Sequence, residues 1–268
     1  MNEVSLSDKE YGRFRNLIRQ VAGINLTQAK KAMVCGRLSK RLQQKQLDSY
    51  DDYIRFLASN AGQDEIQVAV DLITTNETYF FRESKHFDFL SAHVLPKCPP
   101  GRLFRVWSAA CSSGEEPYSL AMLLAENLST TPWEITASDL STRILARAAS
   151  GHYAIERATH IPGKLLMNYC LKGIGTQEGT FVVDPKLRNR ISFLQVNLNK
   201  PLPNLGEFDL IFLRNVMIYF DMEVKRAVVN RMLPLLKPGG HFIVGHSESL
   251  NGVTEKLTAV FPSIYRKQ

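Results

Sequence analysis

The fold of this 268-residue chain is indicated most strongly by the segment Phe208-Asp209-Leu210-Ile211-Phe212-Leu213-Arg214-Asn215. Its run Leu210–Leu213 is continuously apolar, which is typical of a central parallel strand covered on both faces. The run ends abruptly at Arg214 and Asn215. In open α/β sheets ligands bind at the carboxyl ends of strands, so the stretch predicts both a sheet core and one wall of a ligand site.

Further strands alternate with helices in the part of the chain after residue 76. We expect strands at 104–107, 134–138, 191–196, 208–213 and 241–245, with a final hairpin across 257–264. Of the helices between them, one is expected to open at Pro117, one to be capped by Ser141 and one to stop at Pro238-Gly239-Gly240. This alternation predicts an α/β fold with a doubly wound parallel sheet.

The first 75 residues show helical spacing only and predict a small all-α domain. Phe14, Leu17, Ile18 and Val21 recur at the spacing of one helix face, and Gly23 is a suitable stop. Three more helices are expected, one across 27–46, one capped by Asp48 or Ser49, and one around 68–73.

The second of these helices carries basic residues and no acidic one. Lys30, Arg37, Arg41 and Lys45 fall on one side of it, beside an apolar stripe. Such a face is most often simply solvated. Ordinary exposed faces mix both signs of charge, however, so the absence of Asp and Glu favours docking on an acidic surface.

The composition limits the partners and the compartment. A net charge of +7 should attract nucleic acid, an anionic membrane or an acidic protein. The four dispersed cysteines predict a reduced, cytoplasmic protein, and the polar start of the chain lacks a signal-peptide core. No apolar run approaches the ~20 residues of a membrane span. The six histidines form no metal-binding pattern, so no metal is expected.

Three polar features follow predicted strands. The small-residue loop from Ser108 leads to Glu115 and Glu116 at a helix start, which disfavours a pyrophosphate and suits a ligand rich in hydroxyls or amines. Asp139 stands where an acid grips ribose hydroxyls in nucleotide-binding folds, although it would also suit the N-cap of the next helix. Arg214-Asn215 is the third feature.

Five motifs give the chain a specific resemblance. They are Asn76-Glu77-Thr78-Tyr79-Phe80-Phe81-Arg82-Glu83, Ser113-Gly114-Glu115-Glu116-Pro117-Tyr118-Ser119, Ala137-Ser138-Asp139-Leu140, Arg214-Asn215-Val216-Met217-Ile218-Tyr219-Phe220 and Gly245-His246-Ser247-Glu248. With these motifs in this order, the chain closely resembles the chemotaxis receptor methyltransferases, the CheR family, over nearly its whole length.

The resemblance implies a Rossmann-like class I methyltransferase sheet preceded by an all-α domain at 1–75. It further implies a linker at 76–90 that closes over the cofactor, and a methyltransferase domain at 91–268. A small antiparallel β-subdomain is expected within that domain, at about 171–192.

The resemblance also implies S-adenosyl-L-methionine as cofactor and S-adenosyl-L-homocysteine as product. The positions that match the family's cofactor-binding motifs are Asn76, Thr78, Arg82, Glu116, Asp139, Asn197, Leu198, Arg214 and Asn215. Arg82 and Tyr219 are the residues expected to orient the acceptor. For Tyr219, a packed aromatic after a strand is an equally good interpretation.

The implied reaction transfers the methyl group to receptor glutamates, giving γ-glutamyl methyl esters. Glutamate, with a pKa of ~4.3, is already ionised at neutral pH, so no general base is required. The expected partners are methyl-accepting chemotaxis receptors, bound by the basic helix. A receptor's C-terminal pentapeptide would add a strand to the β-subdomain near Gly173, Gly175 and Gly179, although these glycines also suit an ordinary turn. A monomer without direct membrane insertion is expected.

Two rival functions remain open. A nucleic-acid methyltransferase would share fold, cofactor and basic charge, but enzymes acting on exocyclic amines typically carry [D/N]-P-P-[Y/F] where this chain has Arg214-Asn215-Val216-Met217. A catalytically inactive receptor-binding module is the other rival. The occupied cofactor positions argue against it.

Overall fold

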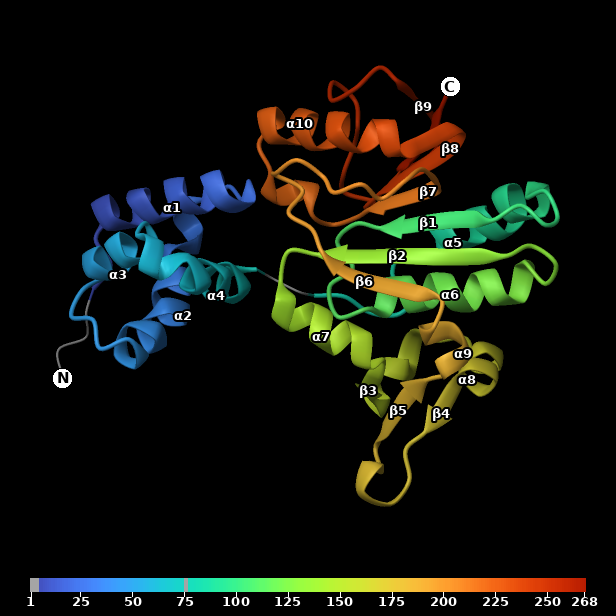
Figure 1. Cartoon of the computed structure of the whole chain (residues 1–268), viewed down its shortest axis with the longest axis horizontal. Helices are drawn as coiled ribbons and strands as arrows, with labels where there is room; N and C mark the ends of the chain where they lie inside the picture. The colour runs from blue at the N-terminus through green and yellow to red at the C-terminus, as the bar shows by residue number, and fades with distance from the viewer. Residues whose placement is uncertain (1–4, 75–76) are drawn as a thin grey trace. The chain divides into compact units, whose positions relative to one another are not determined.

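The computed structural model describes residues 5–74 and 77–268, which divide into two units (Figure 1). The first unit comprises Met1–Thr75 and the short segment Tyr219–Val224, and the second comprises Asn76–Ile218 and Lys225–Gln268. Among the described residues, no helix has both the length and the apolar character that crossing a bilayer would require.

The first unit is all-α, as predicted. Its helices are α1 (Asp8–Ala22), α2 (Lys31–Gln44), α3 (Tyr50–Leu57) and α4 (Gln63–Ile73), with 3₁₀ turns η1 (Gln28–Lys30) and η2 (Asn60–Gly62). Helix α1 starts at a capping box of Ser7 and Glu10 and ends at Gly23, whose φ of 74° is easily reached only by glycine. Ser49, rather than Asp48, caps α3.

The basic side of α2 has anionic and carbonyl partners inside this unit. Arg41 donates to both oxygens of Glu65, at 2.8 and 2.6 Å, and the Lys45 ammonium lies 3.0 Å from the same carboxylate. Arg37 donates to the carbonyl of Leu72 at 2.8 Å. These three cations therefore have partners within the unit, and docking of this face on an acidic surface stays a prediction. The missing acid comes from α4, where Glu65 is only 3% exposed.

Replacing Arg41 by glutamine should lower the free energy of unfolding by about 2–3 kcal/mol, because the buried Glu65 carboxylate would lose its two-pronged partner. Lys40→Gln is the matched control, since Lys40 is exposed on the same helix, and it should change stability by less than about 0.5 kcal/mol. Urea unfolding of both variants measures the difference. Equal stabilities would contradict a structural role for Arg41.

The second unit is built on a seven-stranded sheet in the order β6-β2-β1-β7-β8-β10-β9. The strands are β1 (Phe104–Ser108), β2 (Trp133–Asp139), β6 (Ile191–Gln195), β7 (Phe208–Leu213), β8 (Leu236–Val244), β9 (Leu257–Phe261) and β10 (Ile264–Lys267). Pairing from β6 through β8 is parallel, and β10 pairs antiparallel with β8 and β9. This is the predicted Rossmann-like class I sheet, ending in the predicted hairpin.

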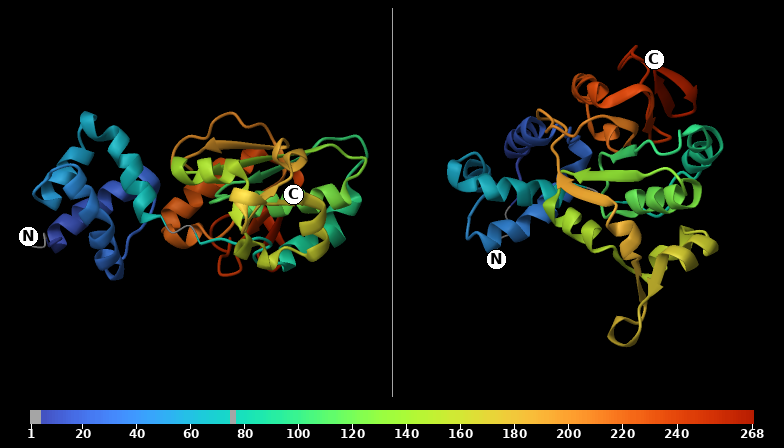
Figure 2. Two further views of the ribbon diagram at one scale, coloured as in Figure 1. Left: turned by 90° about the horizontal axis from the view of Figure 1, so that it is seen from below. Right: turned by 45° about the vertical axis from the view of Figure 1, so that its right-hand side comes forward.

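Helices link the parallel strands (Figure 2). Helix α6 (Glu115–Asn127) packs on β2, and helix α7 (Thr142–Ser150) packs on β2 and β6. The larger connections are α6 (Glu115–Asn127), α7 (Thr142–Ser150) and α10 (Met222–Met232) followed by η8 (Leu233–Leu235), with η7 (Met217–Tyr219) after β7. The segment before β1 forms α5 (Lys85–Phe89), the π-helical turn η3 (Leu90–Val94) and η4 (Leu95–Lys97).

Two boundaries differ from the sequence predictions. Helix α6 begins at Glu115, so Pro117 is its third residue rather than its first; Gly114, with a φ of 96°, is the N-cap. Strand β8 begins at Leu236 and includes Pro238-Gly239-Gly240, which were expected to stop the preceding helix, with the strand starting at His241. Gly239 has a φ of 76°, and the pairing of β8 with β7 shifts register opposite Asp209, so a bulge accommodates these residues inside the strand.

A separate three-stranded antiparallel sheet precedes β6, in the order β3-β5-β4. Its strands are β3 (His152–Ala154), β4 (Cys170–Lys172) and β5 (Thr180–Val183), accompanied by η5 (Ile155–His160), α8 (Gly163–Tyr169), η6 (Gly175–Gln177) and α9 (Pro185–Arg188). The expected range of 171–192 omits β3 and overlaps β6. Three residues were too few for β3 to show a recognisable sequence period.

The β4–β5 connection carries the glycines singled out in the sequence, and it projects away from the main sheet (Figure 2). A Cβ atom on Gly173 would lie 2.0 Å from the carbonyl oxygen of Gln177, so only glycine fits there. Gly175 and Gly179 have φ values of 59° and 80°. Close approach of the backbone at Gly173, and positive φ at Gly175 and Gly179, therefore account for all three glycines.

Strand β7 lies at the centre of the sheet, between β1 and β8. Its residues Leu210–Leu213 are each 0% exposed, and burying a side chain of this size is worth about 1.5–3 kcal/mol. This burial fixes the register of the strand. It thereby holds Arg214 and Asn215 at the carboxyl edge of the sheet.

Candidate active site

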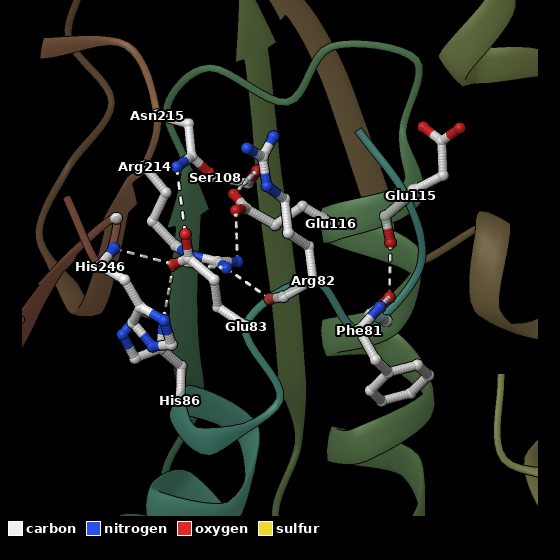
Figure 3. Close-up of polar contacts among 12 residues, drawn as sticks. Phe81, Arg82, Glu83, His86, Ser108, Glu115, Glu116, Arg214, Asn215 and His246 are labelled. Carbon is white, nitrogen blue, oxygen red and sulfur yellow. Dashed lines mark hydrogen bonds and ion pairs between the residues drawn. The ribbon is translucent and has the colours of Figure 1, made fainter. Parts of the chain in front are cut away.

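Arg214 is the centre of a charged network at the carboxyl end of β7 (Figure 3). Its side chain is 2% exposed and lies 3.0 Å from Glu83 and 3.0 Å from Glu116. It also donates to the backbone carbonyl of Arg82. A guanidinium between two carboxylates in a buried place is fully committed to the protein, so it positions the segment around Arg82 against the sheet.

Glu83 accepts hydrogen bonds from several directions. Besides Arg214, the side-chain amide of Asn215 donates to it at 3.1 Å and the backbone N–H of His246 at 3.1 Å. Burial raises the pKa of Glu83, but the Arg214 charge and these hydrogen bonds outweigh burial, so the pKa is lowered overall. Glu83 is therefore an ionised structural partner.

Glu116 faces the opposite side of the Arg214 guanidinium, from the first turn of α6. The hydroxyl of Ser108 donates to it at 2.7 Å. Burial raises the pKa of Glu116 and exceeds the opposing effect of Arg214. A carboxyl group held in this way at a strand end can accept hydrogen bonds from an amine or a hydroxyl of a ligand.

Strained backbone gathers around this network. Six described residues other than glycine have positive φ, and four of them lie here: Phe81 (54°), Glu83 (58°), Ser112 (48°) and Asn215 (58°). Such conformations cost of order 1–3 kcal/mol each and cluster at active sites and ligand clamps. The concentration of strain therefore supports a functional site at this edge.

Asp139 ends β2 and holds the loop that follows β1. Its carboxylate accepts from the backbone N–H of Ser112 at 2.9 Å and of Ser141 at 3.0 Å. The N-cap of α7 is Ser141, whose hydroxyl accepts from Ile144. The alternative role of Asp139 as the helix cap is therefore wrong.

The same loop is anchored from the small sheet. The Tyr153 hydroxyl of β3 donates to the carbonyl of Ser113 at 2.7 Å, and Arg157 pairs with Glu115, which is 0% exposed. A Cβ atom on Gly114 would lie 2.8 Å from the Tyr153 hydroxyl. The loop conformation thus depends on contacts from both sheets.

Arg82 is partly exposed, in contrast to Arg214. Its guanidinium donates to the carbonyl of Glu77 at 2.6 Å and lies 5.8 Å from the centre of the Tyr79 ring. It has no carboxylate partner among residues 5–74 and 77–268. Thr78 is half-buried in the same segment. Asn76, the other predicted ligand there, lies outside the described residues.

The remaining predicted ligands are not part of the network around Arg214. Asn197 follows β6 and accepts from the backbone N–H of Asn199 at 2.9 Å, while Leu198 is 8% exposed and its carbonyl accepts from Arg231. Tyr219 belongs to the first unit, where the Lys30 ammonium lies 4.7 Å from its ring. Its role toward an acceptor stays a prediction.

Glu248 is a site residue to which the sequence interpretation assigned no role. Its carboxylate accepts from the backbone N–H groups of Gly245 (2.7 Å), Asn215 (2.8 Å) and Ile218 (3.2 Å), tying the end of β7 to the end of β8. Glu83 was missed in the same way. Both stand inside recognised motifs, but a carboxylate that binds backbone N–H groups leaves no spacing signal in the sequence.

His86 is 0% exposed, and neither ring nitrogen has a hydrogen-bond partner among the described residues. Ligand atoms of Glu83, His86 and His246 lie within 4.8 Å of one another, a grouping that the sequence pattern did not reveal. A metal would compete there with Arg214, which already occupies Glu83. Burial, followed by the Arg214 charge, lowers the pKa of His86 to about 3.

This low pKa makes stability depend on pH. Between the ordinary histidine pKa of ~6.5 and about 3, the unfolded chain binds a proton at residue 86 that the folded chain does not. Lowering the pH should therefore lower the free energy of unfolding. For this residue, the loss relative to neutral pH should be about 3 kcal/mol at about pH 4. Urea unfolding at about pH 7 and about pH 4 should show a smaller decrease for His86→Leu than for wild type. The same decrease in both would contradict the assignment.

The arrangement suits a ligand with hydroxyl and amine groups better than a phosphate. Asp139 stands at the end of β2, and Glu116 occupies the first turn of α6, where a phosphate would otherwise meet the positive end of the helix dipole. These donors and acceptors fit the ribose hydroxyls and the α-amino group of S-adenosyl-L-methionine.

Comparison with known proteins agrees with this geometry. The family model described as "CheR methyltransferase, SAM binding domain" matches residues 76–265, and "CheR methyltransferase, all-alpha domain" matches residues 9–74. The chain is 40% identical to a chemotaxis protein methyltransferase of Escherichia coli (strain K12), over 98% of this chain and 92% of that protein. It is 37% identical to one of Borreliella burgdorferi, over 98% and 96%.

Solved structures add only a weak likeness. The N-methyltransferase NodS from Bradyrhizobium japonicum WM9, in complex with S-adenosyl-l-homocysteine, is 17% identical, with a TM-score of 0.40 over 71% of this chain and 89% of that one. A similarity of this extent carries no argument about substrate.

Proposed function

The chain belongs to the CheR methyltransferase family, and we propose that it transfers the methyl group of S-adenosyl-L-methionine to glutamate carboxylates of chemotaxis receptors. The observation that carries the proposal is Arg82, a partly exposed guanidinium without a carboxylate partner among the described residues, beside a carboxyl-end edge lined by acids. Such a group can take up a substrate carboxylate.

The cofactor would be held by the edge already described. Asp139 would accept from the ribose hydroxyls and Glu116 from the amino group, while Asn197 and Leu198 would flank the adenine. Arg214 would act through Glu83 and Glu116 rather than by touching the ligand, since its side chain is 2% exposed. Asn215 would help to shape the cofactor site, because its backbone N–H donates to Glu248 and its side-chain amide donates to Glu83.

The bound cofactor supplies an electrophilic methyl group on a sulfonium. The residues of this chain then have to position the acceptor and exclude water. Arg82 would hold the acceptor glutamate through one carboxylate oxygen, leaving the other oxygen in line with the methyl carbon. Because the carboxylate is ionised at neutral pH, no residue needs to remove a proton.

Receptor docking is a proposal for two surfaces. On α2 it rests on cations that remain partly exposed despite their internal partners, with side-chain exposures of 22% for Arg41 and 37% for Lys45. On the small sheet it rests on β4, an outer strand where Leu171 is 51% exposed and Ile174, just after it, 82%. If Lys45→Gln methylates receptors at the wild-type rate at low salt, docking through α2 is contradicted. If the protein does not retain receptor C-terminal peptides in a pull-down, docking through β4 is contradicted.

The chemistry can be tested by the alkali lability of the product. Label transferred from methyl-labelled cofactor to a receptor signalling fragment should be released as methanol in mild alkali, because esters hydrolyse and N-methyl groups do not. A nucleic-acid methyltransferase would label RNA or DNA instead, with an alkali-stable mark. Stable label, or label only in nucleic acid, would overturn the proposal.

A further inference from the structure

A cavity lies at the amino ends of the parallel strands, opposite the candidate active site. It has a volume of about 460 Å³, within the range of small-molecule sites, and its lining includes Phe104 at the start of β1, Asp209 and Gly240. Asp209 near the start of β7 and Arg214 just after its end are five positions apart, or roughly 17 Å in an extended strand. The cavity is therefore separate from the candidate active site.

The charges that line this cavity are unbalanced. Asp209 is its one acid, and Asp209 already accepts from Arg102 at 2.8 Å and from Lys237 at 2.6 Å. The side chain of Lys97 has no hydrogen bond or ion pair to any described residue, and the side chain of Arg266 donates, among the described residues, only to the carbonyl of Gly239, at 3.2 Å. Two cations are thus left without a carboxylate.

The two cations act on the same part of the cavity. His241, which lines it, has its pKa lowered to about 4, first by burial and then by the charges of Arg266 and Lys97. A neutral imidazole there can donate or accept a hydrogen bond. Together these three groups offer an anion two charges and one adaptable polar contact.

The other walls are apolar and partly exposed. Leu103 is 40% exposed and Val260 44%, and both line the cavity. Phe89 lies between two further rings, 5.1 Å from His93 and 5.4 Å from Phe261, measured between centroids. Exposed apolar groups that gather beside a cavity mark a binding site more often than scattered ones do.

We propose that this cavity binds a small organic anion with a planar apolar body, its charged group on Lys97 and Arg266 and its body against Phe89, Leu103 and Val260. The two cations without a carboxylate partner favour a negatively charged ligand, and the aromatic and aliphatic side chains favour one with an apolar ring system. The proposal is independent of the methyl-transfer site and of the acceptor that this site takes.

The probe for the test is 8-anilinonaphthalene-1-sulfonate, added to the full chain with the cofactor site filled by saturating S-adenosyl-L-homocysteine. We expect saturable binding at one site, measured by fluorescence and calorimetry. The uncharged analogue N-phenyl-1-naphthylamine should bind at least about tenfold more weakly, because it lacks the group that the cations attract.

Variants connect the binding to the cavity. Lys97→Gln with Arg266→Gln should raise the dissociation constant about tenfold, and Lys97→Gln alone by about threefold. The single variant removes no internal contact, so it keeps the test valid if the double variant unfolds. Lys172→Gln, an exposed lysine on β4, is the matched control and should change nothing. Absence of saturable binding, or equal affinity in wild type and Lys97→Gln, would overturn the proposal.

Discussion

Replacing Arg214 by methionine should lower the free energy of unfolding by about 3–5 kcal/mol, because two buried carboxylates would lose their shared cation. Glu83 and Glu116 each lie 3.0 Å from this guanidinium, and no other Arg or Lys pairs with either of them among the described residues. Urea unfolding at neutral pH measures the loss. Methyl transfer should be lost with the fold of the site.

Arg143→Gln is the matched control for this prediction. Arg143 is exposed on α7, and the substitution should change stability by less than about 0.5 kcal/mol. If Arg214→Met instead kept its stability and lost only cofactor affinity, Arg214 would be a direct ligand, as the family resemblance implied. The structural role described above would then be wrong.

Replacing Arg82 by alanine should lower kcat/KM for receptor methylation by about 10²–10³-fold, because the acceptor carboxylate would lose its charged anchor. Stability should change by less than about 1 kcal/mol, since the side chain is partly exposed and donates only to the Glu77 carbonyl. Steady-state kinetics with a receptor fragment and urea unfolding measure the two effects separately.

Binding of S-adenosyl-L-homocysteine distinguishes the two possible partners of Arg82. An unchanged dissociation constant in Arg82→Ala would place the guanidinium on the acceptor, whereas a tenfold weaker one would place it on the carboxylate of the cofactor. Arg82→Lys, which keeps the charge but loses the planar guanidinium, should fall between wild type and alanine. Wild-type turnover in Arg82→Ala would contradict any role in the reaction.

Long, regular patterns in the sequence predicted the architecture well. The run Leu210–Leu213 identified the central strand because a strand buried on both faces must be apolar throughout. Ser141 and Gly23 marked helix ends because capping depends on a single local residue. Strand β3 was missed because its three residues are held by pairing with β5 and not by any local preference.

Contacts between distant residues limited the prediction of the site. The sequence placed Arg214 at a strand end correctly, but its partners come from positions 83 and 116, and only the folded chain brings them together. The same limit applied to α2, where the absence of acidic residues within the helix concealed Glu65 on α4. Partners on another element leave no signal in the local sequence pattern.

The proposed reaction transfers the methyl group to a glutamate carboxylate, a claim that tandem mass spectrometry of a receptor fragment can test after reaction with S-adenosyl-L-methionine. We expect the added mass of one methylene on the side chains of specific glutamates, and no addition at these positions when they are replaced by alanine. Methylation on lysine, asparagine or arginine, or none on the fragment alongside methylated nucleic acid, would contradict the claim.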